Sequence, residues 1–178
     1  MKKIGFITGS FKPYTIGHEF LFNKASKECD LVNIFISIQD RKRPKEIPIT
    51  WVQMKKIWDQ YIIPKLPNNI VLHFTNNPTV SLFNFLCEQD LNNYSCYVYS
   101  DSKDINYINS DRVRNKLPLS VRNNLYSVPV DRQKHVNVSS TYMRKIIQNN
   151  DYKTFVKLLP ISLVKNHKDI YQILKGNV

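Results

Sequence analysis

One stretch, KIGFITGSFKPYTIGH at residues 3–18, allows the fold of this chain to be predicted. Its first part, 3–8, is a short run of apolar and β-branched residues, which is typical of a buried strand. Gly9 and Pro13 then interrupt regular structure, and the residues from Gly17 to Cys29 carry apolar side chains at helical spacing. The stretch therefore predicts a strand, a tight loop and the beginning of a helix.

The rest of the chain continues this alternation of strands and helices. Further strands are predicted at 31–37, 70–75, 94–100, 125–130 and 135–138. Helices are predicted at 51–62, with Thr50 as N-cap, at 79–91, at 141–150 and in two further segments up to residue 175. Segment 101–124 is polar and irregular, and we expect it to contain a loop that moves or that grips a ligand. Alternating strands and helices imply an α/β fold, a Rossmann-like doubly wound parallel sheet with C-terminal helices.

The length of 178 residues predicts one domain with a substantial core. We expect an α/β core at 1–145 and a helical C-terminal extension at 146–178. No apolar run approaches the roughly 18 to 20 residues that span a bilayer, and the first apolar run is shorter than that of a signal peptide. We therefore expect a cytoplasmic protein without membrane contact, whose oligomeric state stays open.

The composition restricts the function classes without choosing among them. Cys29, Cys87 and Cys96 form no CxxC pair, which excludes a disulfide framework or a cysteine zinc site and favours buried apolar roles. The net charge of +12 invites a nucleic-acid interpretation, but 19 lysines against 7 arginines indicate a general compositional bias. The basic cluster 41–45 is either a solvated loop or a phosphate or polynucleotide contact.

The loop after the first strand has the chemistry of an anion site. A glycine after a strand, here Gly9, lets backbone N–H groups approach a ligand closely. Gly17 and His18 then open a helix, whose N-terminal dipole favours an anion. The stretch matches neither the P-loop pattern nor GxGxxG. Taken alone, it could also be a strand-to-helix turn with an incidental histidine.

A second helix beginning strengthens the phosphate hypothesis. The residues VSSTYMR, 138–144, follow the last predicted strand and open a helix. Ser139, Ser140 and Thr141 are good N-cap candidates beside backbone N–H groups that a helix leaves unbonded. Arg144 lies three residues beyond Thr141, so both can share one face of the first turn. Capping explains the hydroxyls alone, but two such helix beginnings in one α/β chain favour polyphosphate binding.

Together, GSFKPYTIGH and VSSTYMR resemble the HxGH and ISSTxxR signatures of the nucleotidyltransferase superfamily. The first signature is here Thr15-Ile16-Gly17-His18, with threonine in the first position. The resemblance covers about the first 145 residues in architecture, although only the two motifs are specific. A weaker likeness is to small phage-type members, in which a TIGHE start accompanies a tail like NNDYKTFVKLLP, 149–160.

The resemblance implies attack on the α-phosphate of a nucleoside triphosphate by a second substrate, with release of pyrophosphate. His18 would contact the α-phosphate and stabilise the transition state, and a hydroxyl hydrogen bond from Thr15 would support it. Arg144 would hold the β- and γ-phosphates, and Lys12 would neutralise a phosphate of either substrate. The other expected nucleotide contacts are Gly9, Ser10, Phe11, Gly17, Asp101, Ser139, Ser140 and Thr141.

The resemblance also implies a magnesium ion that enters with the triphosphate, held mostly by substrate and water, with no metal ligand from the protein. Two departures affect the acceptor and the site. Thr15 stands where many members have histidine, and the helix at 51–62 lacks an early arginine that many members place near the acceptor. Asp101 could equally cap a following helix. Trp51 and Trp58 could stack on a ring, although core packing is favoured.

The leading hypothesis is an adenylyltransferase that uses ATP and a small phosphorylated acceptor. Nicotinamide mononucleotide, giving NAD, is the first acceptor to consider because GSFKP…GH most resembles that branch. Pantetheine phosphate as acceptor and cytidylyl transfer from CTP are alternatives. A hypothesis of another class is a basic nucleic-acid-binding module on the same fold, in which His18 and Arg144 would be dispensable.

Overall fold

The computed structural model describes residues 1–40, 44–101, 110–131 and 138–176, which divide into two compact units. The first, here called the sheet unit, contains Met1–Ser10, Leu21–Ser37 and Pro67–Arg132. The second, here called the helical unit, contains Phe11–Phe20, Ile38–Leu66 and Gln133–Val178. Each unit therefore consists of three separate segments of the sequence.

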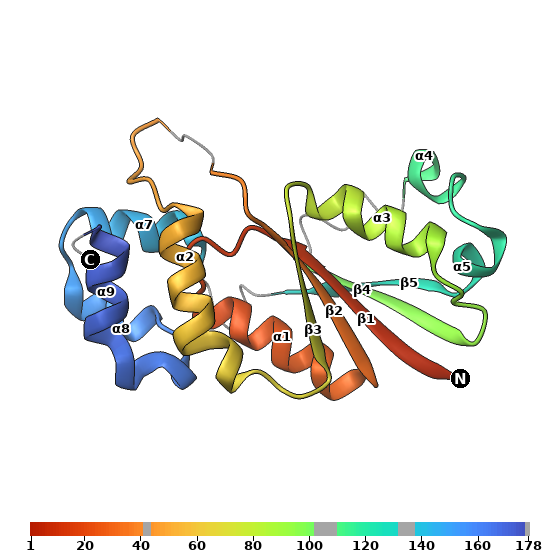
Figure 1. Ribbon diagram of the computed structural model, residues 1–178, viewed down its shortest axis with the longest axis horizontal. Coiled ribbons are helices and arrows are strands. Elements are labelled where there is room, and N and C mark those ends of the chain that lie inside the picture. Colours follow the sequence, from red (N-terminus) through yellow and green to blue (C-terminus); the bar gives the residue numbers. More distant parts are fainter. Residues whose placement is uncertain (41–43, 102–109, 132–137, 177–178) are drawn as a thin grey trace. The chain divides into compact units, whose positions relative to one another are not determined.

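The sheet unit is built on a parallel five-stranded sheet (Figure 1). Its strands, in the order β3-β2-β1-β4-β5, have the bounds β1 Lys2–Gly9, β2 Leu31–Ser37, β3 Ile70–Thr75, β4 Tyr94–Asp101 and β5 Leu125–Val130. This confirms the predicted α/β, Rossmann-like fold. The β-branched and aromatic runs seen in the sequence form these strands because both faces of a parallel sheet are covered.

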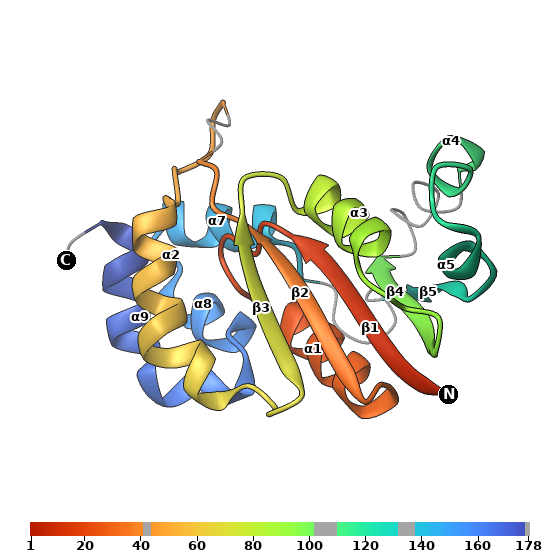
Figure 2. The ribbon, with the colours of Figure 1, turned by 45° about the vertical axis from the view of Figure 1, so that its right-hand side comes forward.

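Alternate residues of β1 face the two sides of the sheet. On one side, Phe6 joins a core cluster with Leu82 and Leu86 of helix α3, Pro78–Glu88, which lies along that face (Figure 2). On the other side, a Cβ atom at Gly5 would meet the Cys29 sulfur at 3.2 Å, so a larger residue there would require its neighbours to shift.

The strand order places a topological switch point at β1 and β4. The chain adds β2 and β3 on one side of β1 and then returns to add β4 and β5 on the other. Ligands of open α/β sheets bind outside the carboxyl ends of strands at such a point. Gly9 ends β1 and Asp101 ends β4, so these two predicted nucleotide contacts lie at this edge of the sheet.

The helical unit contains the beginning of α1, Ile16–Glu28, and a group of helices later in the chain (Figures 1 and 2). These are α2 Trp51–Ile57, its continuation through a π-helical turn η1 Trp58–Ile62 and a 3-10 turn η2 Ile63–Lys65, then α7 Ser140–Gln148, α8 Tyr152–Leu158, the 3-10 helix η3 Ile161–Asn166 and α9 His167–Lys175. Trp58, Met143 and Phe155 are fully buried and anchor the core of this unit.

Glu19, in the first turn of α1, ties that helix to the C-terminal tail. Its carboxylate accepts hydrogen bonds from the backbone N–H groups of Ile161, at 2.9 Å, and Ser162, at 3.3 Å, and from the Ser162 hydroxyl. The N–H groups that open η3 are thus satisfied by a side chain. The residue that follows His18 therefore positions the segment just after the NNDYKTFVKLLP tail.

Several sequence expectations differ from the structure in detail. The segment 101–124, predicted as an irregular loop, contains two short helices, α4 Asp111–Arg114 and α5 Leu119–Asn123, and its residues 102–109 lie outside the described part. The predicted strand 135–138 and most of the basic cluster 41–45 also fall on residues outside it. All three cysteines are free, and Cys87 is half-buried where the other two are buried. Within the described ranges, no helix has the length and apolar character that crossing a bilayer requires.

Candidate active site

The GSFKPYTIGH stretch forms a tight loop that ends in the first turn of α1. The Thr15 carbonyl accepts hydrogen bonds from the backbone N–H groups of His18, at 2.9 Å, and Glu19, at 3.1 Å, which begins the helix. Phe11 adopts a left-handed backbone conformation with φ 47°, although it has a bulky side chain. Such conformations cost about 1–3 kcal/mol and cluster at functional sites.

The His18 ring is buried and held in one orientation. Its Nδ1 accepts a hydrogen bond from the backbone N–H of Thr15, at 3.0 Å, and lies 3.2 Å from the Thr15 hydroxyl oxygen. Because a backbone N–H can only donate, Nδ1 must be unprotonated, and the proton of the neutral ring is on Nε2. The predicted support of His18 by Thr15 is present as a contact, and the ring N–H is on the side of Nε2.

Two aromatic rings enclose the imidazole. Phe11 meets it edge-on at a centroid distance of 5.0 Å, and Tyr14 stacks on it at 5.8 Å. Burial, and then the nearby Glu19 carboxylate, raise the pKa of Tyr14 well above its ordinary value, so this hydroxyl stays protonated at neutral pH. The ring thus lies in an apolar environment, in which a hydrogen bond to phosphate is stronger than in water.

The second motif meets the first directly. Ser139 caps α7, because its side chain accepts from the backbone N–H of Tyr142 at 3.1 Å. The Ser140 hydroxyl donates to the Pro13 carbonyl at 3.1 Å, and Arg144 donates from Nη1 to the Lys12 carbonyl. Two residues that lie far apart in the sequence thus fix the same loop.

Arg144 is the most buried cation among these residues, at 5% exposure. Besides the Lys12 carbonyl, its guanidinium donates from Nη2 to the Thr141 hydroxyl at 2.9 Å and from Nε to the Glu46 carboxylate. The predicted sharing of one face by Thr141 and Arg144 is a hydrogen bond in the structure. These three contacts, on three different nitrogens, fix the plane of the guanidinium.

Lys12 is also buried, and its ammonium group turns toward the segment that leads into α2. Its Nζ donates to the Gln39 carbonyl at 2.8 Å and to Asp40 at 3.0 Å, and lies 5.8 Å from the centre of the Trp51 ring. Asp40 in turn accepts from the backbone N–H of Trp51 at 2.6 Å. Lys12 therefore links the first motif to the beginning of α2.

The structure distributes the predicted site residues over both units. The helical unit brings together Phe11, Lys12, Thr15, Gly17, His18, Ser139, Ser140, Thr141 and Arg144. Gly9, Ser10 and Asp101 belong to the sheet unit, where all three are half-buried. Of the two tryptophans, Trp58 is wholly buried and packs beside Phe11 and Tyr14 in the core, whereas Trp51 is half-buried beside Lys12.

Two contacting residues, Asp40 and Glu46, could not be found from the sequence. They flank the basic cluster 41–45, and they lie 28 residues from Lys12 and 98 residues from Arg144, respectively. No local spacing rule connects residues so far apart. The sequence does contain one weak signal. A buried arginine needs a carboxylate partner, and a chain with only 14 acidic residues offers few candidates for it.

Comparisons with known proteins bear on the first motif and on the fold. A family model described as the citrate lyase ligase C-terminal domain matches residues 4–54, which include the first motif. No curated protein sequence gives a significant match.

Among solved structures, the fold is similar to nicotinic acid mononucleotide adenylyltransferase from Plasmodium falciparum complexed with NaAD, with a TM-score of 0.61 and 21% identity over 100% of this chain and 97% of that one. It is also similar to a bifunctional NMN adenylyltransferase/ADP ribose pyrophosphatase from Francisella tularensis, with a TM-score of 0.63 and 16% identity over 99% of this chain and 53% of that one. A third is the NadR protein in complex with NAD and AMP-PNP, with a TM-score of 0.61 and 17% identity over 92% of this chain and 46% of that one.

The chain thus spans about half the length of the last two proteins. At these identities the likeness establishes the fold, and function has to be argued from the site.

Proposed function

We propose that this protein, whose fold and family-model match fit a member of the nucleotidyltransferase superfamily, transfers AMP from ATP to a small phosphorylated acceptor and releases pyrophosphate. The observation that carries the proposal is the meeting of the two motifs. Ser140 and Arg144 bind the carbonyl groups of Pro13 and Lys12, beside a histidine whose Nδ1 is already bonded. Hydroxyl, guanidinium and imidazole donors are thereby gathered in one unit of the protein.

His18 would act on the phosphorus that is attacked. With Nδ1 bonded to the Thr15 backbone, Nε2–H is the donor that can reach an α-phosphate oxygen as negative charge builds up on it. The aromatic neighbours Phe11 and Tyr14 hold the ring, so it needs no reorientation during the reaction. No covalent intermediate is required, because phosphoryl-type transfer depends mainly on positioning and charge stabilisation.

Arg144 would hold the β- and γ-phosphates, which leave together as pyrophosphate. Its Nη2 is bonded to Thr141, so the hydroxyl and the guanidinium form one donor group at the beginning of α7. The Ser139 hydroxyl, which accepts from Tyr142, could add its O–H. Ser140, whose hydroxyl is bonded to Pro13, could add its backbone N–H from the same turn, where the helix dipole also favours an anion. Lys12 would contribute positive charge while it fixes the loop through Asp40.

Magnesium fits this site as a companion of the nucleotide. Among the residues that the structure describes, no group of three His, Cys, Asp or Glu side chains could hold a metal ion. Magnesium commonly keeps several waters and binds substrate phosphates, so triphosphate oxygens would be its ligands here. When bound, it would neutralise phosphate charge. A Francisella tularensis neighbour has been solved with AMP and a manganese ion, which supports a divalent cation.

The acceptor that we propose is nicotinamide mononucleotide, giving NAD. The neighbours in complex with NaAD and with NAD and AMP-PNP support a pyridine mononucleotide as the acceptor class. Nicotinic acid mononucleotide belongs to the same class. CTP as donor and pantetheine phosphate as acceptor are the alternatives that the same motifs allow.

The test is pyrophosphate release in the presence of magnesium. The donor is ATP or CTP, and the acceptors are nicotinamide mononucleotide, nicotinic acid mononucleotide and pantetheine phosphate. We expect release with ATP and a pyridine mononucleotide, and a loss of about 100-fold or more in His18→Ala, because a transition-state donor is removed. The thermal unfolding curve of the variant should stay close to that of the wild type. Release only with CTP would move the protein to the cytidylyl branch, and release by His18→Ala at the wild-type rate would contradict the proposal.

A further inference from the structure

The segment 38–50, described at 38–40 and 44–50, supplies a carboxylate to each of the two motif cations. Asp40 pairs with Lys12 at 3.0 Å, and Glu46 pairs with Nε of Arg144. Glu46 is the better shielded of the two acids, with 23% of its side chain exposed against 53% for Asp40. The arginine that would hold the leaving phosphates thus has a partly buried carboxylate beside it.

We propose that Glu46 is a positioning residue that orients Arg144 for the triphosphate, an inference that rests on the proposed nucleotidyl transfer. Glu46 binds through Nε, the nitrogen closest to the aliphatic stem of the side chain. The Lys12 carbonyl and the Thr141 hydroxyl bind at the other two nitrogens. With the stem end held by a charge-assisted hydrogen bond, the Nη end stays beside Thr141, the predicted phosphate ligand.

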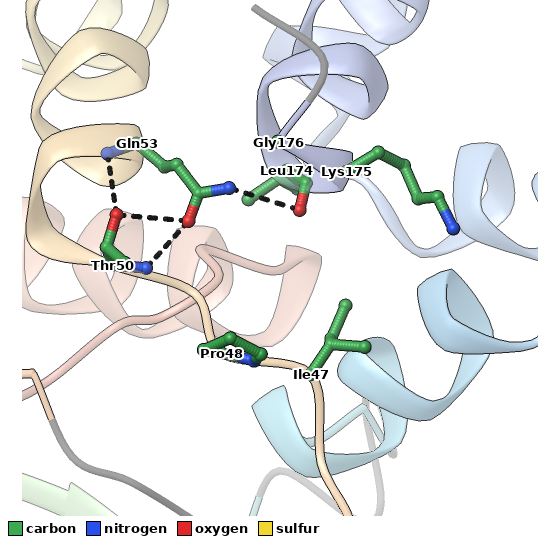
Figure 3. A pocket seen from close by; sticks show the side chains of 7 residues that line it. All are labelled: Ile47, Pro48, Thr50, Gln53, Leu174, Lys175 and Gly176. Atoms are coloured by element: carbon green, nitrogen blue, oxygen red, sulfur yellow. Dashed lines mark hydrogen bonds between the residues drawn. The ribbon is translucent and has the colours of Figure 1, made fainter.

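The segment that follows Glu46 is held by hydrogen bonds of Thr50 and Gln53; Figure 3 shows those between Thr50 and Gln53 and the one from Gln53 to Leu174. Thr50 and Gln53 form a capping box at the beginning of α2, in which the Gln53 side-chain oxygen accepts from the Thr50 backbone N–H at 2.7 Å. The Gln53 side-chain nitrogen reaches α9 and donates to the carbonyls of Ile173, at 2.8 Å, and Leu174, at 3.3 Å. One glutamine therefore couples the helix after Glu46 to the C-terminal helix.

A cavity of about 360 Å³ lies on this side of the segment, lined by Ile47, Pro48, Thr50, Gln53, Leu174, Lys175 and Gly176 (Figure 3). On the N-terminal side, Asp40 is bound both by Lys12 and by the Trp51 backbone N–H. Glu46 thus lies between two held points of the chain, Asp40 and the capping box of α2, which suits a residue that keeps Arg144 in place. A carboxylate that occupied the phosphate position only until the nucleotide bound would instead need a segment that is free to move away.

Charge also favours a supporting role over a competing one. A buried guanidinium without a counter-charge is costly, and Glu46 supplies Arg144 with a counter-charge before any nucleotide is bound. Because Glu46 takes the Nε side, a phosphate can approach the Nη side without first displacing it. The pair would therefore persist in the nucleotide complex.

The experiment compares wild type, Glu46→Gln and Glu46→Ala in steady-state kinetics and in calorimetric titration with a non-hydrolysable ATP analogue and magnesium. Glu46→Gln keeps an acceptor for Nε–H, whereas Glu46→Ala removes it. We expect the KM for ATP and the analogue Kd to rise by about 10- to 100-fold in Glu46→Ala and by less in Glu46→Gln, because Arg144 loses the charge-assisted hydrogen bond that orients it. The KM for the acceptor should stay within about twofold.

The matched control is Asp59→Asn, which removes one negative charge from an exposed pair with Lys55 in the same unit. It should leave ATP binding unchanged. In the background of Arg144→Ala, adding Glu46→Ala should have no further effect on ATP binding, because the glutamate acts through the arginine. Titrations are run well below the lowest unfolding temperature of the set, so a stability loss cannot imitate a binding loss.

The outcomes separate this inference from the function on which it rests. Tighter binding of the analogue by Glu46→Ala or Glu46→Gln would overturn the inference, since Glu46 would then be a competitor of phosphate. Equal binding by wild type and Glu46→Ala would overturn it as well. A wild type that binds no triphosphate would overturn the proposed function, and the inference with it. Both would be supported if Glu46→Ala weakens analogue binding in the wild-type background and has no further effect in the Arg144→Ala background.

Discussion

At the scale of single residues, the site depends on which atoms are already bonded before a substrate arrives. The Nδ1 atom of His18 accepts a hydrogen bond from the Thr15 backbone, and all three guanidinium nitrogens of Arg144 donate to the protein. Such preorganisation lowers the reorganisation needed in the reaction. The contact to Nδ1 comes from a backbone N–H, so it does not depend on the side chain at position 15.

Thr15→Val should reduce activity only slightly. The variant keeps the size of the buried side chain and the backbone N–H to Nδ1 but loses the hydroxyl, 3.2 Å from Nδ1. Because one ordinary hydrogen bond contributes about 0.5–1.5 kcal/mol, we expect kcat to fall by only about 2- to 12-fold. Long-range ¹H–¹⁵N spectra should show His18 as the neutral Nε2–H tautomer in both proteins. An Nδ1–H signal in the wild type would contradict the assignment.

At the scale of elements, α2 and α9 depend on one shared glutamine. Gln53 completes the capping box of α2 and also satisfies carbonyl groups in the last turn of α9, which ends at Gly176 in a left-handed conformation. A single side chain thus closes the first turn of one helix and the last turn of another. Loss of the Gln53 side chain should therefore destabilise both α2 and α9.

We expect Gln53→Ala to lower the free energy of unfolding by about 1–2 kcal/mol, because a cap and a bridging hydrogen bond are lost together. Gln148→Ala, an exposed site on α7, makes the same chemical change without those contacts and should change stability by less than about 0.5 kcal/mol. Urea unfolding followed by circular dichroism measures both. Equal midpoints for the two variants would contradict the bridging role.

The elements also indicate how far sequence patterns reach. The strands 31–37 and 70–75 were predicted with the observed bounds, because each is a short β-branched run between polar residues. Helix 51–62 begins at Trp51 after its Thr50 cap as predicted, but α2 ends at Ile57 and continues as a π-helical turn, which apolar spacing does not distinguish from an α-helix. The motif residues His18 and Arg144 could be singled out by local chemistry. Glu46 could not, because only the tertiary fold brings it to Arg144.

At the scale of the whole molecule, the net charge of +12 predicts attraction to any polyanion, with or without a specific site. This attraction should be separable from the proposed activity. Nucleic acid binding that rests on dispersed lysines depends on counterion release and therefore weakens steeply with salt. Triphosphate binding by a few buried groups should depend on salt much less.

We expect a single-stranded RNA oligonucleotide to bind weakly at 50 mM salt and to lose about 10-fold or more in affinity at 200 mM, equally for wild type and His18→Ala. Fluorescence anisotropy measures this. RNA binding that survives 200 mM salt and is abolished by Arg144→Ala would instead point to an RNA end as the acceptor.

The interleaving of the two units also has a consequence for synthesis on the ribosome. The helical unit takes its first segment from residues 11–20 and its last from residues 133–178, so it cannot be complete until about the final quarter of the sequence has been translated. At roughly 5–20 residues per second, many seconds separate the emergence of His18 from that of Arg144. Once residue 130 has emerged the nascent chain contains all five strands of the described sheet, but it still lacks the arginine and the hydroxyls of α7. A translation product that is truncated at that point should therefore be unable to bind a nucleotide.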